Sequence, residues 1–323
     1  MKLSYIVWII TKQCNLRCLH CYAKLYENEN ELTPEDREKL AKEICELEVP
    51  HVSISGGEPL LLHDIFKIIS IFRDYGISTS IVTNGTLLNE DIVKKLNRLD
   101  VYIYISVDGI KETHEKLRGA GTWNRVLKSL ELLHRENAQF GTVMAISNIN
   151  YTVVDKYIEN VVKYEPDSIN VIPVMASGRA RETLTYVHVE HMRVSIEKLV
   201  QKTEELGVNV RVWCLPCLPA YTDSRRLIAY ACRNLRVVDI SPGGRLLLCD
   251  VTNVEICRWS PGKLRECIES YFSHDTVRLV LENVPDECKN CRFVNVCRGG
   301  CYARAFLQFG DFRRKDPLCP LIH

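Results

Sequence analysis

Length, composition and charge are those of a globular protein and exclude several classes. The chain has 323 residues, of which 46% are hydrophobic and 26% are charged, enough for two domains or one large α/β barrel with an appendage. The net charge of +1 gives no field that would attract nucleic acid or an anionic membrane surface. The apolar run at 5–10 continues into polar residues without a small-residue cleavage site, and no run reaches the roughly 18 residues of a membrane span. We therefore expect a cytoplasmic protein with no nucleic-acid or membrane partner.

Strand-like and helix-like segments alternate through the first two thirds of the chain. The continuous apolar run YIVWII (5–10) predicts a strand buried on both faces, and LTPEDREKLAKEICEL (32–47) predicts a helix that Thr33 can cap. The further predicted strands are 51–56, 77–82, 101–107, 140–147 and 168–174, and the further helices are 64–75, 89–97, 123–136, 152–164 and 188–206. Six β/α units are too few for an ordinary eight-fold barrel, so we expect a partial barrel with a parallel sheet inside its helices.

Fifteen cysteines are distributed unevenly along this chain. Three lie between residues 14 and 21, Cys45 stands alone, and eleven fall between residues 214 and 319. Cytosolic thiols stay reduced, so we expect metal ligands or core residues rather than disulfides. Because core cysteines would be scattered, the distribution predicts one cysteine site at the start of the chain and a cysteine-rich final third.

Unusual motifs directly follow four of the predicted strands. A cysteine triplet follows the first strand, and the sequences SGGEP, TNG and SVDG follow the second, third and fourth. In parallel α/β architectures the carboxyl ends of the strands meet at one rim, where ligands bind. We therefore expect these motifs to lie around a single site.

The triplet TKQCNLRCLHCYAK (11–24) has the spacing C-x3-C-x2-C. Three thiolates are one short of the four that complete a structural zinc site or an ordinary cubane cluster. Either a fourth ligand comes from far away, or one iron of a [4Fe–4S] cluster stays open to chelate the amino and carboxylate groups of a small molecule. Zinc, or incidental core cysteines, is the alternative.

The turn SISGGEPLL (53–61) supplies groups that suit such a ligand. Gly56 and Gly57 allow a close approach of the backbone, and Glu58 offers a carboxylate to an ammonium group. Alone the stretch would be a plain β–α turn. One β/α unit after a cysteine triplet, it indicates a ligand site.

The triplet after the first strand and the Gly-Gly-Glu-Pro turn after the second resemble the radical S-adenosylmethionine enzymes, over the whole chain. The resemblance implies that the triplet, Cys14, Cys18 and Cys21, ligates a [4Fe–4S] cluster whose open iron binds the methionine part of S-adenosylmethionine. In that family one electron cleaves the sulfonium, and the 5′-deoxyadenosyl radical released abstracts a hydrogen atom from the substrate.

The same resemblance implies a set of residues that hold S-adenosylmethionine. Gly56, Gly57 and Glu58 match the turn that holds the methionine amino group. Ser106 matches a position that contacts the ribose or carboxylate, and Arg118 matches an arginine that meets the methionine carboxylate.

Three further residues complete this set. Asn84 and Pro173 are candidates at the ends of the third and sixth predicted strands. The residue before the third cysteine, usually aromatic in the family, is His20, whose neutral imidazole can still pack against adenine.

The final third contains a seven-cysteine array. CRNLRVVDISPGGRLLLCD begins and ends with cysteine, CKNCRFVNVCRGGC has the spacing C-x2-C-x5-C-x3-C, and a last cysteine follows. With GKLRECIESYF (262–272) as the helix between its groups, the array resembles the SPASM extension of radical enzymes, which carries two auxiliary iron–sulfur clusters. A zinc ribbon is the alternative.

The SPASM resemblance assigns the cysteines to two sets, giving three clusters in all, expected as [4Fe–4S]. One auxiliary cluster takes Cys288, Cys291, Cys297 and Cys319. The other takes Cys232, Cys249 and Cys301, and its fourth ligand usually lies upstream. CLPC offers Cys214 and Cys217; we expect Cys217 because it is nearer in sequence, and a site without a fourth thiolate stays open as an alternative.

Four residues lie outside these assignments. Cys45, Cys257 and Cys267 match no ligand position, so we expect small buried or half-buried residues. Asp250 directly follows a predicted ligand. A related class that oxidises a Cys or Ser side chain to formylglycine places its proton-accepting Asp there; a surface acid near a cationic loop is the alternative.

These features predict a radical S-adenosylmethionine enzyme of the SPASM group. We expect a partial (β/α)6 barrel over residues 1–208, a bridging segment over 209–231 and a cysteine-rich, largely irregular SPASM domain over 232–323. Because SPASM enzymes mostly modify peptides or proteins, we expect a crosslink or side-chain oxidation, with the auxiliary clusters carrying away the electron left after hydrogen abstraction.

The expected partners follow from that reading. They are a peptide or protein substrate, a separate peptide-recognition protein if any, and an external flavodoxin- or ferredoxin-like electron donor. One alternative is an enzyme of small-molecule cofactor biosynthesis, because VIPVMASGRA (171–180) is similar to relatives that trim tetrapyrrole side chains. Another is a non-catalytic protein that binds zinc.

Overall fold

A computed structural model describes residues 3–232 and 235–321 of the chain. Within these residues eleven strands form one sheet, in the order β11-β10-β9-β1-β2-β3-β4-β5-β6-β7-β8. Their bounds are β1 (Tyr5–Thr11), β2 (His51–Gly56), β3 (Ser78–Thr83), β4 (Val101–Ser106), β5 (Phe140–Ile146), β6 (Ser168–Pro173), β7 (Val210–Trp213), β8 (Leu227–Tyr230), β9 (Val237–Ile240), β10 (Arg245–Leu247) and β11 (Glu255–Arg258). All neighbours from β9 to β8 pair in parallel, whereas β10 and β11 are antiparallel additions at one edge.

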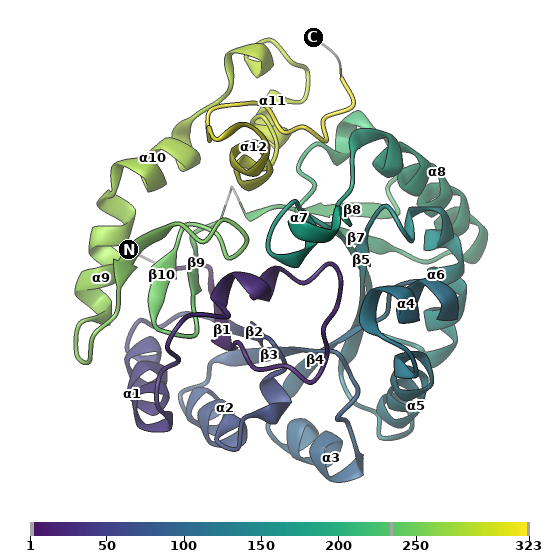
Figure 1. Cartoon of the computed structure of the whole chain (residues 1–323). Helices are drawn as coiled ribbons and strands as arrows, with labels where there is room; N and C mark the ends of the chain where they lie inside the picture. Colours follow the sequence, from purple (N-terminus) through teal and green to yellow (C-terminus); the bar gives the residue numbers. More distant parts are fainter. Residues whose placement is uncertain (1–2, 233–234, 322–323) are drawn as a thin grey trace.

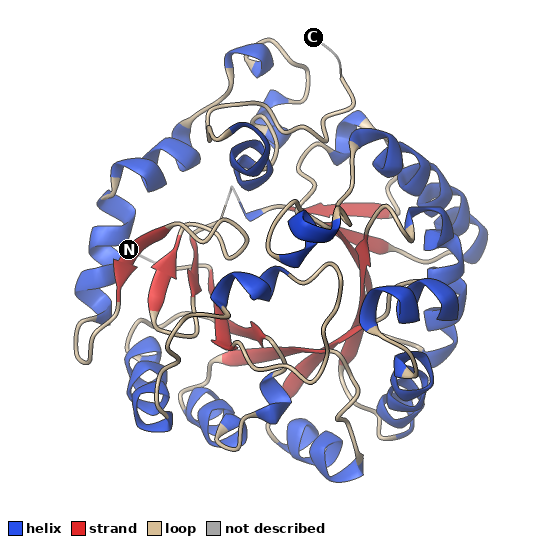
Figure 2. Ribbon diagram, viewed as in Figure 1, coloured by secondary structure: helices blue, strands red, loops and turns tan. Residues whose placement is uncertain are grey.

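Helices cover the outer face of this sheet, which curves into an open ring (Figures 1 and 2). The α-helices of the described residues are α1 (Pro34–Cys45), α2 (Ile65–Asp74), α3 (Glu90–Arg98), α4 (Lys111–Arg118), α5 (Thr122–Arg135), α6 (Val154–Val161), α7 (Arg179–Thr183), α8 (Val189–Leu206), α9 (Leu264–Ser273), α10 (Asp275–Glu282), α11 (Val294–Cys297) and α12 (Tyr302–Phe309), of which α7 lies over the mouth of the ring (Figure 1). The helices of the described ranges include none with the length and apolarity to cross a bilayer. The predicted partial barrel is confirmed.

Local signals account for the elements at the start of the chain. β1 pairs with β2 on one side and β9 on the other, so Ile6, Trp8, Ile9 and Ile10 are fully buried. Thr33 accepts the Asp36 amide at 3.2 Å and Pro34 occupies the first position of α1, as the capping pattern predicts. Because β1 to β6 run parallel in the sheet, their carboxyl ends meet at the mouth of the ring.

The sheet extends further along the chain than expected. Segment 209–231, expected as a bridge, contributes β7 and β8, and the cysteine-rich part contributes β9 to β11. β7 and β8 have four residues each, which is short for a strand signal, and the apolar Ile228 and Tyr230 of the edge strand β8 are exposed. The last helices, α11 and α12, lie at the open side of the ring (Figure 1).

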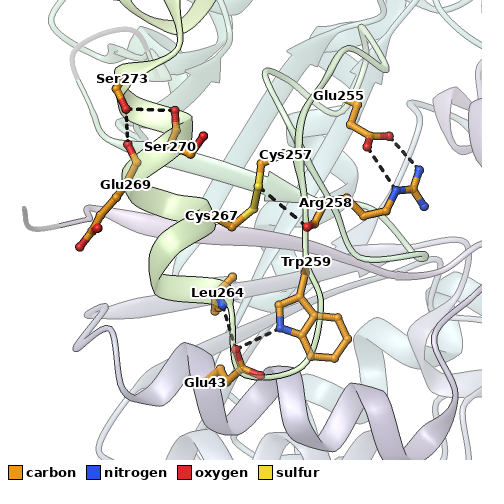
Figure 3. Close-up of a disulfide and its surroundings, with 10 residues drawn as sticks. All are labelled: Glu43, Glu255, Cys257, Arg258, Trp259, Leu264, Cys267, Glu269, Ser270 and Ser273. Carbon is orange, nitrogen blue, oxygen red and sulfur yellow. Dashed lines mark hydrogen bonds and ion pairs between the residues drawn. A yellow bond between two sulfur atoms is a disulfide. The ribbon is translucent and has the colours of Figure 1, made fainter.

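The expectation that all cysteines outside the clusters are reduced is wrong at one pair. Cys257 in β11 and Cys267 in α9 form a disulfide, with Cα atoms 5.9 Å apart (Figure 3). The short connection brings α9 back over β11, and Glu43 fixes it by accepting from Trp259 Nε1 (3.1 Å) and the Leu264 amide (2.9 Å). The expectation rested on the reduced state of cytosolic thiols, which does not indicate which two cysteines lie close enough to bond. Cys45 is buried in the core, as expected.

Candidate active site

The loop that carries the cysteine triplet, residues 12–21 (the triplet loop), lies over the mouth of the ring after β1 (Figure 1). Neighbouring strand–helix connections hold its backbone. The Leu19 amide donates to the Leu117 carbonyl in α4 at 2.8 Å, and the amide of Arg179, the first residue of α7, donates to the Cys21 carbonyl at 2.9 Å. The loop is thus fixed by elements that follow β4 and β6.

The three thiols of the triplet lie within electrostatic reach of one another. Burial raises the pKa of Cys14 and, to about 11, that of Cys18, and the charge that Cys21 carries when deprotonated adds to both shifts. Cys14 is exposed and Cys18 is buried. Neutral, closely spaced thiols suit a metal group that deprotonates its ligands on binding.

The turn after β2 is built against this loop. The amides of Gly57 and Glu58 donate to the carbonyls of Thr11 (2.7 Å) and Gln13 (2.8 Å). A Cβ on Gly56, where φ is 142°, would lie 2.4 Å from the Thr11 oxygen, and one on Gly57 would lie 2.1 Å from the Gln13 oxygen. We expected these glycines to let the backbone approach a ligand. In the structure they let it approach the triplet loop, which sets Glu58 beside the thiols.

Glu58 is a fully buried carboxylate at the rim. It accepts from Thr83 Oγ1 (2.8 Å) and from the amides of Asn84 (2.8 Å) and Leu60 (3.2 Å). Burial raises its pKa to about 6 in spite of these donors, and its charge contributes to the raised pKa of Cys14. A carboxylate has about four acceptor positions, so one remains for the predicted ammonium contact.

Glu58→Gln keeps the side-chain shape and removes the charge. Losing one partner of a charge-assisted contact costs roughly 2–4 kcal/mol, so the Kd for S-adenosylmethionine should rise by something between 30- and 1,000-fold at neutral pH or above. In the unchanged protein, affinity should fall as pH drops through about 6, because protonation neutralises Glu58. The variant should lack that pH dependence. Calorimetric titration of the reconstituted proteins measures both; equal Kd values above pH 7 would refute the assignment.

Arg118 points to an internal carboxylate. Its Nε donates to Asp108 Oδ2 at 2.6 Å, His20 Nε2 lies 3.4 Å from the same oxygen, and Asp108 Oδ1 accepts the Ala145 amide at 2.9 Å. Burial lowers the pKa of His20 to about 4, so its imidazole is neutral at pH 7. Asp108 is a residue that sequence reasoning missed, although an acid directly after a strand end was the available signal.

The remaining predicted cofactor residues also lie at strand ends. Ser106 and Pro173 are the last residues of β4 and β6, and Asn84 follows β3. Asn84 Nδ2 donates to Asn15 Oδ1 at 2.9 Å and lies 4.0 Å from Cys14 Sγ. Their contacts with S-adenosylmethionine stay a prediction.

Four cysteines from separate segments lie within electrostatic reach of one another, and we call them the inner cysteine group. They are Cys214, Cys232, Cys249 and Cys301. Burial raises the pKa of Cys214, and the charges of Cys232 and Cys301 raise it further. The pKa of Cys249 is raised most by burial, then by the charges of the nearby carboxylates, and then by Cys232 and Cys301.

Five cysteines line a separate small cavity; we call them the outer cysteine group. They are Cys217, Cys288, Cys291, Cys297 and Cys319. Cys217 therefore does not lie with the inner group, contrary to the expectation from sequence proximity. Cys214 has a left-handed backbone with φ of 55° directly after β7, so the chain turns there and Cys217, three residues on, faces the other cavity.

Asp250 lies between the triplet loop and the inner group. Tyr26 donates to its carbonyl oxygen at 2.5 Å, and the hydroxyl of Tyr22, directly after the triplet, lies within electrostatic reach of its carboxylate. Its Oδ1 lies 3.6 Å from Cys249 Sγ, and its amide donates to Asp239 at 2.7 Å. Burial raises the pKa of both acids, and the Asp250 charge raises that of Asp239 further. Asp250 is half-buried rather than a solvated surface acid; Asp239, inside β9, gave no sequence signal.

Comparison with known proteins agrees with this geometry. Residues 8–163 match the Radical SAM superfamily. The chain is 26% identical to the Fe-coproporphyrin III synthase of Methanosarcina barkeri (99% of this chain, 88% of that protein) and 25% identical to the PqqA peptide cyclase of Bradyrhizobium diazoefficiens (97% and 84%). Streptococcus suis SuiB bound to precursor peptide SuiA has the same fold, with a TM-score of 0.78 at 16% identity over 99% of this chain and 76% of SuiB.

The matched residues contain the triplet loop, the glycine turn and the strand ends that surround them. The relatives extend over nearly the whole chain, through both cysteine groups. Residues 8–163 therefore form a domain of the Radical SAM superfamily, and the protein is a radical SAM enzyme, which implies S-adenosylmethionine and a [4Fe–4S] cluster as cofactors.

Proposed function

We propose that this enzyme is a SPASM-type maturase that oxidatively modifies a peptide or protein, by a crosslink or a side-chain oxidation. The observation that carries the proposal is the inner cysteine group with Asp250 beside it. Asp250 lies within electrostatic reach of Tyr22, next to the triplet, and its carboxylate lies 3.6 Å from the Cys249 sulfur of the inner group, so it can accept a proton while a cluster held by that group accepts an electron.

The donor sets fit three iron–sulfur clusters. The triplet offers three thiols beside a buried carboxylate, and the outer group lines a cavity with thiol side chains. Burial raises the pKa of Cys288 to about 11 and that of Cys297 to about 12, so these thiols stay neutral until a metal group deprotonates them. We assign the triplet to the first cluster, the inner group to a second and four of the outer cysteines, Cys288, Cys291, Cys297 and Cys319, to a third.

The roles of the chain's own residues follow from their positions. When bound, the first cluster supplies the electron that cleaves S-adenosylmethionine. Glu58 binds the methionine amino group, Arg118 is held near the triplet by Asp108, and Asp250 accepts the substrate proton. Residues 1–208 are proposed as the catalytic part, 209–231 as the segment that supplies Cys214, and 232–323 as the SPASM part.

The assignment of Cys214 has a matched test in its neighbour. Cys214→Ala should remove about four irons per chain, because a cubane of the inner group loses a ligand. Cys217→Ala should keep all three clusters, since the outer group retains four thiols. Iron and sulfide analysis after anaerobic reconstitution measures both. The reverse order of iron loss would show that Cys217, and not Cys214, is the ligand.

The substrate class is tested by mass spectrometry of anaerobic reactions that contain a reduced flavodoxin or ferredoxin as electron donor. Peptides encoded by genes next to that of the enzyme are the first probes. A crosslink and a side-chain oxidation both remove two hydrogen atoms from the peptide, matched by one 5′-deoxyadenosine per event. Peptides that stay unchanged while a tetrapyrrole is consumed would overturn the proposal.

A tetrapyrrole substrate is the second candidate function. The observation that favours it is the match to the Fe-coproporphyrin III synthase of Methanosarcina barkeri, which extends over 99% of this chain. Because Fe-coproporphyrin III is the product named for that relative, the probe in the same assay is an iron tetrapyrrole with side chains whose removal gives Fe-coproporphyrin III. Its conversion with stoichiometric 5′-deoxyadenosine would establish this function instead.

A further inference from the structure

Arg304 and Asp316 form a buried ion pair in the C-terminal part of the chain. Arg304 in α12 is 4% exposed and Asp316 is 0% exposed. Nε and Nη2 of the guanidinium bind the two carboxylate oxygens at 2.9 and 2.7 Å, a two-point geometry that fixes both groups. A Cβ on Gly300 would lie 2.2 Å from Asp316 Cβ, so the chain passes the pair closely.

The pair connects the two cysteine groups. Arg304 Nη2 also donates to the Cys214 carbonyl at 2.5 Å, and the Asp316 carboxylate accepts the Cys301 amide at 2.8 Å; both cysteines belong to the inner group. The same carboxylate accepts the amide of Leu318 at 3.0 Å, directly before the last cysteine of the outer group. One ion pair thus fixes backbone at both proposed cluster sites.

One donor of the pair is unused. Nη1 of Arg304 is buried and has no hydrogen-bond partner among residues 3–232 and 235–321. Proteins rarely leave a buried charged donor unpaired, so its acceptor is expected to be a bound group. Sulfide and thiolate sulfurs are such acceptors. The guanidinium reaches the inner group through Nη2 and the Cys214 carbonyl, and its partner Asp316 accepts the Cys301 amide, so the guanidinium lies next to two cysteines of that group.

Resting on the proposed ligand sets, we propose that Arg304 donates Nη1–H to a sulfur of the inner-group cluster, positioned by Asp316, and thereby raises that cluster's reduction potential. A hydrogen bond and a positive charge at the sulfurs favour the reduced, more negative form of a cluster. A raised potential helps the oxidised cluster to take the one electron of the substrate radical, while the proton goes to a base. Arg304 and Asp316 are positioning residues that do not touch the substrate.

The competing acceptor is water. Arg304 also lines a cavity of about 110 Å³ with Tyr186 and Gln308, which has room for ordered water molecules. A water there would satisfy Nη1 without any effect on a cluster. The two acceptors differ in a magnetic property, because only the sulfur contact couples the guanidinium nitrogen to the unpaired electron of a reduced cluster.

Pulsed electron paramagnetic resonance of the reconstituted full chain tests the contact without mutation. Protein labelled with ¹⁵N only in the guanidinium nitrogens of arginine should show a ¹⁵N coupling to a reduced auxiliary cluster that protein with ordinary arginine lacks. Absence of that coupling, with about twelve irons bound per chain, would overturn the inference and leave the proposed function standing. A chain that holds only about four irons would overturn both.

Arg304→Lys tests the effect on potential. It keeps a charge and removes the guanidinium fork, so the ¹⁵N coupling should vanish and the inner-group cluster should become harder to reduce in a redox titration. Arg193→Lys is the matched control, because Arg193 donates to the Pro320 carbonyl at 2.7 Å but is 42% exposed. An unchanged potential with an intact cluster would contradict the inference. If the lysine variant loses the cluster, the labelled unmutated protein decides.

Discussion

Replacing Cys14, Cys18 and Cys21 together with alanine is expected to abolish cleavage of S-adenosylmethionine while removing only about a third of the iron. The reason is that the triplet loop is separate from the inner and outer cysteine groups, whose side chains come from residues 214–319. Production of 5′-deoxyadenosine with an excess of chemical reductant measures the first quantity. Iron and sulfide analysis of the same samples measures the second, on the basis of roughly four irons per cubane.

Cys45→Ala is the matched control for the triple variant. Cys45 is buried in the core at the end of α1 and belongs to none of the three groups, so its variant should keep all the iron and full cleavage. Cleavage at an undiminished rate by the triple variant would remove the triplet from its assigned role. Loss of all the iron would contradict the prediction that the other two clusters are held independently of the first.

Asp250→Asn is expected to lower product formation by about 10²–10⁴-fold, the scale of a lost general base, while S-adenosylmethionine is still cleaved. The substitution preserves the shape of the side chain and removes its capacity to accept a proton. Cleavage of the cofactor needs only the first cluster, so the two activities should separate. The assay follows peptide product and 5′-deoxyadenosine in the same reaction, with the peptide identified as described above.

A structural role for Asp250 would give a different result. Asp250 adjoins Cys249, and its amide donates to Asp239 at 2.7 Å, so a supporting residue would act through the inner group. In that case the spectrum of the auxiliary clusters should change in Asp250→Asn, and loss of product should follow loss of iron. If neither product nor spectrum changes, Asp250 has neither role.

The barrel could be predicted from sequence because its signals are local. The continuous apolar run of β1 and the helix start at Thr33–Pro34 can each be predicted from adjacent residues alone. β7 and β8 gave no such signal: each has four residues, and β8 forms an edge with exposed apolar side chains. These short strands depend on the sheet that they extend.

The site could be predicted where spacing alone carries the chemistry. The C-x3-C-x2-C triplet and the Gly-Gly-Glu turn are contiguous motifs, and the structure brings them into contact. Pairing between distant segments could not be predicted. Whether Cys214 or Cys217 joins the inner group depends on one left-handed residue, and the partners of Asp250 and Arg304 depend on the packing of β9 and α12.

The cluster count of the unmodified chain tests the central claim most directly. Anaerobic reconstitution followed by iron, sulfide and zinc analysis, with Mössbauer spectroscopy on ⁵⁷Fe-labelled protein, reports how many clusters the three cysteine groups hold. The account predicts about twelve irons and twelve sulfides per chain, all in [4Fe–4S] clusters, with negligible zinc. About four irons with zinc in the remaining cysteine groups would contradict it, because no auxiliary cluster would then be present to take the substrate's electron.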